Sequence, residues 1–109
     1  MDTELIACQS FISVRGGIEI NKIQATLAEL YHYRGDLEYQ RNNLIQAQTF
    51  FKKSLEIEPD HAETLFNLGL CLGRQGNYSE AEKTLIELRE IYPSNRFILF
   101  YLDETRKKL

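Results

Sequence analysis

The sequence predicts an all-α protein made of antiparallel helix pairs that repeat along the chain, and two observations carry this prediction. Residues 28–61 are similar to residues 62–95 at an offset of 34 positions. Within each copy, the residue pattern indicates a helix, a tight turn, a second helix and a stop. The identities at this offset are Ala28/Ala62, Glu29/Glu63, Gly35/Gly69, Asn43/Asn77, Ala47/Ala81, Glu56/Glu90, Ile57/Ile91 and Pro59/Pro93.

The first helix of the second copy is the clearest element. Leu65, Leu68 and Leu72 recur at helical spacing and form an apolar stripe. Asp60 stands where a residue that caps the helix start is expected. Gly76 can adopt the left-handed conformation that commonly ends a helix. We therefore expect a helix between Asp60 and Gly76.

The second helix of each copy follows the same plan. Asn77 is the expected cap of this helix in the second copy, and Asn43 is its counterpart in the first. Ala81 and Leu85 line the expected inner face, and Pro93 prevents the helix from continuing.

Two glycines lie in the middle of predicted helices. Gly35 and Gly69 would each cost about 1 kcal/mol relative to Ala at an isolated helix position. Their recurrence at the repeat offset indicates that a neighbouring helix approaches too closely for a Cβ atom. The same reasoning applies to Ala47 and Ala81.

These residues resemble the tetratricopeptide repeat, whose signature over 34 residues is W-x2-L-G-x2-Y, then A-x3-F, then P. The resemblance implies a right-handed superhelix of antiparallel helix pairs, about six helices in all, and a non-catalytic role in protein binding. In the second copy the matching residues are Leu65, Leu68, Gly69, Leu72, Ala81, Leu85 and Pro93, and in the first they are Tyr31, Arg34, Gly35, Glu38, Ala47, Phe51 and Pro59.

The first copy departs from this signature at Arg34 and Glu38, which stand where the family has Leu and Tyr. These two residues are four positions apart and can pair along the helix. This side of the first copy either faces water or is covered by the N-terminal segment.

We expect one domain over residues 1–109, because stacked repeats bury their apolar faces only against neighbours. Its predicted parts are an N-terminal helical segment (1–27), two repeats (28–61 and 62–95) and a C-terminal capping helix (96–109). In the first part, a short helix over 3–14 would end at Gly16-Gly17, and Asn21 would cap a long helix. Ser94 or Asn95 would cap the last helix.

Composition narrows the class of function. The 109 residues are 43% hydrophobic and 27% charged, and the net charge of −3 argues against a nucleic-acid groove. The longest apolar run, 97–102, is too short to cross a membrane. Cys8 and Cys71 have no metal-ligand spacing and are typical of thiols in a reducing compartment, so we expect a cytoplasmic location.

The sequence shows no arrangement of catalytic or metal-binding residues. His32 and His61 lack metal-ligand spacing with a cysteine or with each other, and no phosphate-binding loop follows Gly16-Gly17. We therefore expect no enzyme activity, no cofactor and no metal.

The first helix of each repeat is expected to line a concave binding groove. Helical geometry favours a mixture of aromatic and charged residues there, suited to a helical or extended peptide. The predicted groove residues are His32, Tyr33, Asp36, Tyr39, Phe66, Asn67, Leu70, Arg74 and Tyr101.

Three interpretations of this groove and its surroundings remain open. The chain is an adaptor or assembly module, a small dedicated chaperone similar to type III secretion chaperones, or a self-assembling unit joined through 97–102. The adaptor interpretation requires an open groove. The alternative is that a terminal segment of the chain fills the groove. The family's carboxylate clamp is not expected, because Asp36, Phe97 and Tyr101 stand at positions where the clamp needs an amide or a cation.

Overall fold

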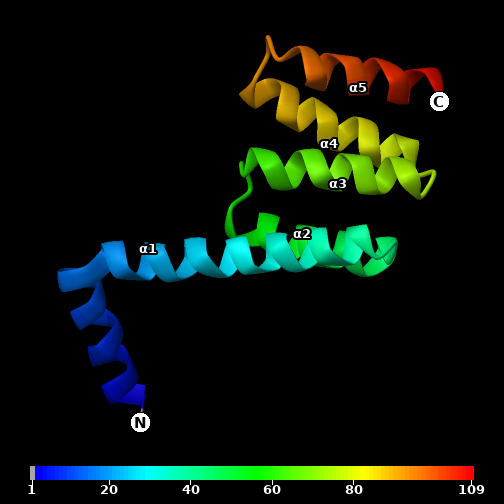
Figure 1. Cartoon of the computed structure of the whole chain (residues 1–109). Helices are drawn as coiled ribbons and strands as arrows, with labels where there is room; N and C mark the ends of the chain where they lie inside the picture. Colours follow the sequence, from blue (N-terminus) through cyan, green and yellow to red (C-terminus); the bar gives the residue numbers. More distant parts are fainter. Residues whose placement is uncertain (1) are drawn as a thin grey trace.

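The computed structural model describes residues 2–109, and it describes side chains from residue 20 onward. These residues form helices only, packed as a stack of antiparallel neighbours joined by short loops (Figure 1). The predicted all-α helical solenoid is therefore confirmed. The helices are α1 (Asp2–Gln40), α2 (Leu44–Ile57), α3 (Ala62–Arg74), α4 (Tyr78–Ile91) and α5 (Arg96–Lys107).

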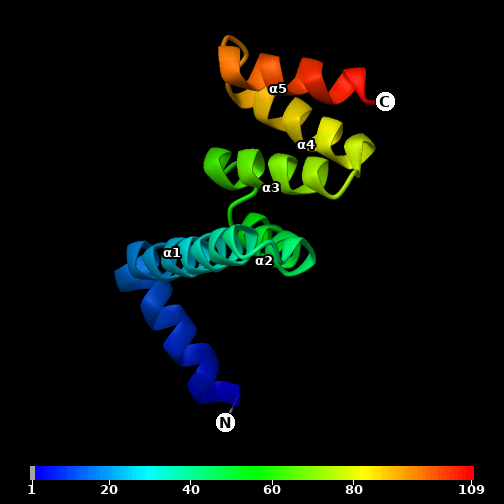
Figure 2. The same ribbon diagram turned by 45° about the vertical axis from the view of Figure 1, so that its right-hand side comes forward.

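Five helices stand over residues 2–109 where about six were expected, and α1 accounts for the difference. Asn21 lies inside α1, so it does not cap a new helix as predicted. α1 also runs without a break through residues 3–14 and Gly16-Gly17, so the predicted end of a short helix at Gly16-Gly17 is wrong. α1 extends well past the start of the first repeat and projects beyond α2 (Figures 1 and 2).

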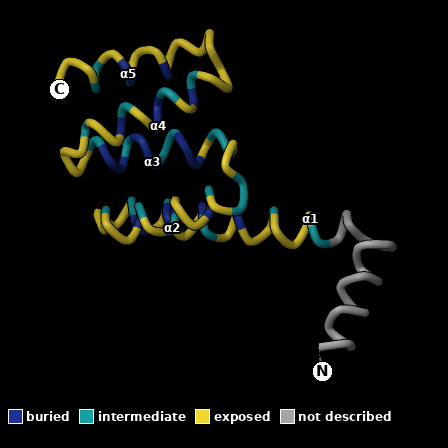
Figure 3. The backbone as a smooth tube through the Cα atoms, turned by 180° about the vertical axis from the view of Figure 1, so that it is seen from behind, coloured by how far each residue is buried: buried dark blue, intermediate teal, exposed yellow. Residues whose placement is uncertain are grey.

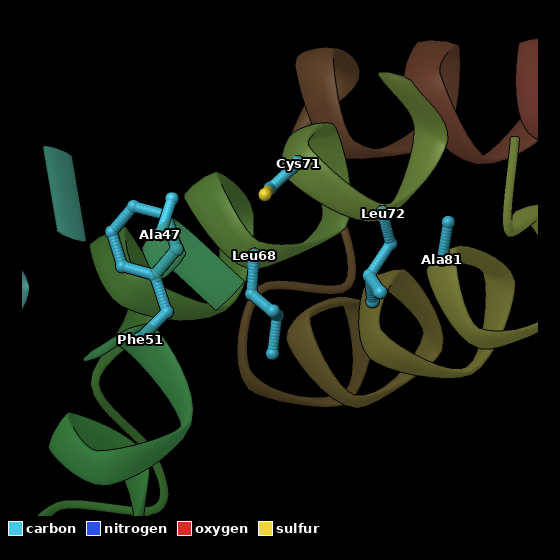
Figure 4. Close-up of a cluster of buried hydrophobic side chains, with 6 residues drawn as sticks. All are labelled: Ala47, Phe51, Leu68, Cys71, Leu72 and Ala81. Carbon is cyan, nitrogen blue, oxygen red and sulfur yellow. The ribbon is translucent and has the colours of Figure 1, made fainter. Parts of the chain in front are cut away.

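Two clusters of buried side chains hold the stack together. The first joins α2, α3 and α4 (Figure 4), and the second joins α3, α4 and α5. The buried positions lie along the facing sides of neighbouring helices, with exposed positions turned outward (Figure 3). The first cluster contains Ala47, Phe51, Leu68, Cys71, Leu72 and Ala81, and the second contains Leu65, Leu85, Leu88, Ile98 and Leu102.

Both mid-helix glycines face a large side chain of the next helix. A Cβ atom on Gly35 would lie 2.7 Å from the Phe51 ring, and one on Gly69 would lie 3.0 Å from a methyl group of Leu85. Since Cβ atoms do not normally approach so closely, the predicted close approach is confirmed at both positions.

The turns within the two helix pairs share a left-handed residue, which the sequence analysis predicted in the second pair only. Gly76 has a φ angle of 82°, as its predicted role requires, and Asn42 at the equivalent position has a φ angle of 64°. In each pair the next residue donates its backbone N–H across the turn, from Asn43 to Glu38 O at 2.8 Å and from Asn77 to Leu72 O at 2.9 Å. Asparagine is the residue that best replaces glycine in this left-handed conformation.

The caps differ in chemistry from the prediction. α3 is capped by His61, whose Nδ1 accepts from the Thr64 backbone N–H, and not by Asp60. Asn43 and Asn77 stand at the predicted cap positions but make no side-chain cap bond. Their side-chain amides instead donate to carboxylates, that of Asn43 to Glu38 and that of Asn77 to Glu80. Asn95 caps α5 by accepting from two backbone N–H groups.

Candidate functional site

The surface between α3 and α5 is built around two aromatic residues. Phe66 of α3 and Tyr101 of α5 meet edge to face, with ring centroids 5.3 Å apart. Both side chains are partly exposed, because Leu65 and Leu102, their immediate neighbours in sequence, take the buried positions. Helix periodicity thus leaves the aromatic pair at the mouth of the groove between the two helices.

A hollow of about 480 Å³ opens on one side of this pair. Its floor is apolar and comes from Phe66, Leu88, Ile98 and Tyr101, and its rim carries Glu63. Phe97 also lines it and has 73% of its surface exposed. A volume of this size can hold one large side chain of a ligand together with part of the backbone.

A second hollow, of about 220 Å³, opens on the other side of Tyr101. It is lined by Leu70 and Gly73 of α3, and its polar rim combines Arg74 with Glu104 and Lys108. The two hollows share Tyr101 and form one groove along α3 and α5, which we call the α3–α5 groove. Its ends differ, because the larger hollow carries an acid and the smaller one carries charges of both signs.

The predicted groove residues on α1 form a separate surface. The Arg74 guanidinium lies over the Tyr39 ring at 5.0 Å and donates to the Asn42 side chain at 3.1 Å, which ties α3 to the end of α1. Asp36 accepts a hydrogen bond from Gln40 of its own helix, and Tyr33 is largely exposed. None of Tyr33, Asp36 and Tyr39 lines the α3–α5 groove.

His32 is the one predicted groove residue that the structure buries. Only 4% of its surface is exposed, so its ring lies beneath the groove surface. Nδ1 is 3.0 Å from Thr64 Oγ1, which is in turn 2.6 Å from His61 Nδ1. The ring also packs against Phe51. The helical wheel places His32 near the groove, but the start of α3 brings its cap residue His61 and Thr64 over the ring.

The structure therefore brings together four of the nine predicted residues, Phe66, Leu70, Arg74 and Tyr101, in the α3–α5 groove. Asn67 is half-buried on α3 and lines neither hollow. Sequence reasoning missed two tyrosines at loop ends, Tyr78 and Tyr92, which complete the two hollows. Their positions beside the helix caps give no periodic signal that would have revealed them.

Among the residues from 20 onward, no group of three or more His, Cys, Asp or Glu side chains is placed to hold a metal ion. Burial raises the pKa of the Cys71 thiol, which donates to the Leu44 carbonyl at 3.2 Å. A buried thiol with a raised pKa is a poor nucleophile.

No helix over the described part of the chain is long and apolar enough to cross a membrane.

Stacked antiparallel helix pairs with an open aromatic groove define the class of helical-repeat binding scaffolds. The family model for the tetratricopeptide repeat matches residues 26–94. The chain belongs to the tetratricopeptide repeat family. Members of this family generally mediate protein–protein interactions and are generally not catalytic.

Two curated proteins show the same similarity over shorter stretches. Protein POLLENLESS 3-LIKE 2 of Arabidopsis thaliana is 41% identical over 46 residues, which are 42% of this chain and 10% of that protein. Tetratricopeptide repeat protein 7A of Homo sapiens is 35% identical over 60 residues, which are 55% of this chain and 7% of that protein. The chain thus matches only a small part of each relative.

Proposed function

We propose that this chain is a protein-binding module that holds a helical or extended peptide in the α3–α5 groove, in an adaptor or assembly role in the cytoplasm. The observation that carries the proposal is the Phe66–Tyr101 pair between two apolar hollows. Partly exposed aromatics at the centre of a concave surface are the residues that most often dominate binding energy. The frame of the site is a single domain of two repeats, 28–61 and 62–95, closed by the helix over 96–109.

The shape and charge of the groove restrict the peptide. The larger hollow accepts a bulky apolar side chain beside Phe97, and the nearby carboxylate of Glu63 favours a basic neighbour. The smaller hollow presents Arg74 and Lys108 together with Glu104. A matching ligand has an apolar anchor, a basic residue next to it, and mixed charges one or two helical turns away.

The test is capture of partners from the native host by the purified chain, followed by binding of the peptide that the capture identifies. Phe97→Ala removes one wall of the larger hollow without touching the core, because its side chain is exposed. Phe66→Ala removes one ring of the aromatic pair. Each of these two variants is expected to weaken peptide binding at least about tenfold, as measured by fluorescence polarisation. Ile45→Ala is the matched control, since it removes an equally exposed apolar side chain on α2, outside both hollows.

The outcomes separate the possible roles. Unchanged binding in both groove variants would refute the α3–α5 groove as the binding site. Several captured proteins with a common segment would favour the adaptor role. One partner captured at equal stoichiometry would narrow the role to that of a dedicated chaperone.

A further inference from the structure

The end of the stack formed by α1 and α2 exposes a continuous apolar surface, which we call the α1 face. It consists of Ile23, Leu27, Leu30 and Leu37 of α1 and the ring of Phe50 of α2. Ile23 is 68% exposed and Leu30 is 59% exposed. A hollow of about 450 Å³ runs along this face between the two helices. It lies away from the α3–α5 groove, so the proposed function leaves it unused.

The second helix pair shows what this surface normally does in the fold. At the repeat offset of 34, Leu30, Arg34 and Leu37 correspond to Thr64, Leu68 and Cys71. All three of the latter are buried, and Leu68 and Cys71 belong to the cluster shared with Ala47 and Phe51 of α2 (Figure 4). The same helix face is thus covered by a helix in one pair and bare in the other.

The outward side of α5, at the opposite end of the stack, mixes charged residues with the exposed Leu99 and Phe100. The side of α5 that would receive a further helix carries Asp103 and Arg106 at the positions of Gly69 and Leu72. Both side chains are exposed, and Arg106 pairs with Glu82 of α4 at 3.0 Å. The α1 face has no such replacement along Ile23, Leu27, Leu30 and Leu37.

The spacing along α1 identifies the geometry of a partner. Positions 23, 27, 30, 34 and 37 alternate steps of four and three residues, which is the seam of a coiled coil. Only Arg34 is polar in this seam. Its guanidinium lies 5.4 Å from the centre of the Phe50 ring and its Nε is 3.6 Å from the Glu38 carboxylate. The charge is therefore partnered within the chain, and the side chain's aliphatic stem remains available for packing.

We propose that two copies of this chain pair through the α1 face, with their α1 helices antiparallel around a two-fold axis. The seam is self-complementary in this arrangement, because Leu27 of one copy meets position 30 of the other and Ile23 meets position 34. The projecting part of α1, around Ile23, then fills the hollow beside Phe50 of the other copy.

Charge selects the antiparallel arrangement. In a parallel pair the two Arg34 side chains would face each other, which is destabilising. In the antiparallel pair they lie near opposite ends of the seam, each against an isoleucine. The flank positions between Ile23 and Arg34, which are Gln24, Thr26, Tyr31 and Tyr33, carry no charge, so no like charges oppose each other over this part of the seam.

The first experiment measures the mass of the full chain in solution by sedimentation equilibrium, from micromolar to submillimolar concentration. A dimer is expected. Leu30→Glu is expected to weaken the dimer at least about thirtyfold, because it places two carboxylates near the two-fold axis. Ile45→Glu, at a similarly exposed apolar position of α2 outside the α1 face, is the control and should keep the wild-type mass. Far-ultraviolet circular dichroism checks that each variant remains folded.

The second experiment tests orientation by disulfide trapping in a Cys8→Ser background. Ile23→Cys/Arg34→Cys should form a covalent dimer under mild oxidation, and each single substitution alone should not. Positions 23 and 34 of one helix are about 16 Å apart, too far for a bond within one chain. The buried Cys71 thiol is not expected to compete.

Three results would overturn the proposal. One is a monomer at every concentration, and another is crosslinking of the single-substitution variants, which indicates a parallel pair. The third is a dimer that Leu30→Glu leaves intact but Phe100→Glu dissociates. That result would assign self-association to residues 97–102, where Phe97, Leu99 and Phe100 are exposed. Peptide binding in the α3–α5 groove should be unchanged by Leu30→Glu, so the two proposals can fail independently.

Discussion

The two helix pairs, α1–α2 and α3–α4, share the residues at their helix crossings but differ in the residues that face outward. Where the helices of a pair cross, both use glycine against a large side chain, Gly35 against Phe51 and Gly69 against Leu85. Where the pair meets its surroundings, the residues diverge, as with Arg34 in the first pair and Leu68 in the second. The contacts at the glycine crossings are therefore fixed by the repeat, and outward positions follow whatever lies next to the pair.

Glu38 shows how far a repeat position can change without loss of order. It corresponds to Leu72, and both residues are buried, with 6% of Glu38 exposed. The Glu38 carboxylate accepts from the Asn43 side chain at 2.8 Å and lies 3.5 Å from the Arg41 guanidinium. A buried carboxylate is tolerated when it is paired and hydrogen-bonded. The first pair thus joins its two helices through a polar contact where the second pair uses an apolar one.

The largest expected difference between the pairs comes from Phe51→Ala. Phe51 packs against His32 and Gly35 of α1 and also belongs to the cluster shared with α3. Its truncation is expected to lower the free energy of unfolding by about 4 kcal/mol, measured by urea denaturation. Leu85→Ala should cost about 3 kcal/mol, since the side chain is smaller.

The control for this pair of variants is Ile45→Ala, an exposed position that should change stability by less than about 0.5 kcal/mol. A smaller loss for Phe51→Ala than for Leu85→Ala would contradict the view that the first pair depends on the aromatic ring for its contacts on both sides.

A glycine series gives a smaller effect and tests the helix crossings directly. Gly35→Ala places a methyl group 2.7 Å from the fully buried ring of Phe51, so the ring or the helix must shift. We expect a net loss of about 1–2 kcal/mol after the gain in helix propensity. Gly69→Ala places its methyl group 3.0 Å from a methyl group of Leu85, a milder overlap than at Gly35, so the gain in helix propensity should about offset the cost.

Gly73→Ala is the control in this series, because nothing lies within 4 Å of its added Cβ. It should stabilise the protein by up to about 1 kcal/mol through helix propensity alone. The order Gly73, Gly69, Gly35, from stabilising to destabilising in urea denaturation, is the expected result. An equal effect at Gly35 and Gly69 would mean that the two crossings are not differently packed.

The sequence predicted the crossings well because they depend on small residues that recur. A close helix crossing requires small residues, and these recur at the offset of 34 positions as Gly35 and Gly69 and as Ala47 and Ala81. The α3–α5 groove was half predicted, since helical geometry places Phe66 and Tyr101 on one surface but contains no information about loops.

The failures have a common physical cause. His32 is covered by residues 29 and 32 positions later in the chain, His61 and Thr64, so its burial is a tertiary effect with no local signal. The cap of α3 shifted from Asp60 to His61 because an imidazole nitrogen can accept the same backbone N–H. Asn21 failed as a cap because α1 continues through it, and a favourable cap residue does not by itself end a helix.

The smallest expected effect concerns the left-handed turn residues, Asn42 and Gly76. Gly76→Ala should cost about 1 kcal/mol from backbone strain alone, because nothing lies within 4 Å of the added Cβ. Gly76→Asn should cost only a few tenths of a kcal/mol, since asparagine tolerates this conformation. Asn42→Gly should change stability by less than about 0.5 kcal/mol, because the relief of backbone strain is offset by the lost hydrogen bond from Arg74.

The comparison between Gly76→Asn and Gly76→Ala isolates backbone conformation, because both add a Cβ atom at an open site. The free energies of unfolding of the three variants, measured by urea denaturation under one set of conditions, test this expectation. If Gly76→Asn and Gly76→Ala were equally destabilising, asparagine would have no special tolerance for this turn. The presence of Asn42 in the first pair would then depend on its hydrogen bond to Arg74, which joins the turn of one pair to the leading helix of the next.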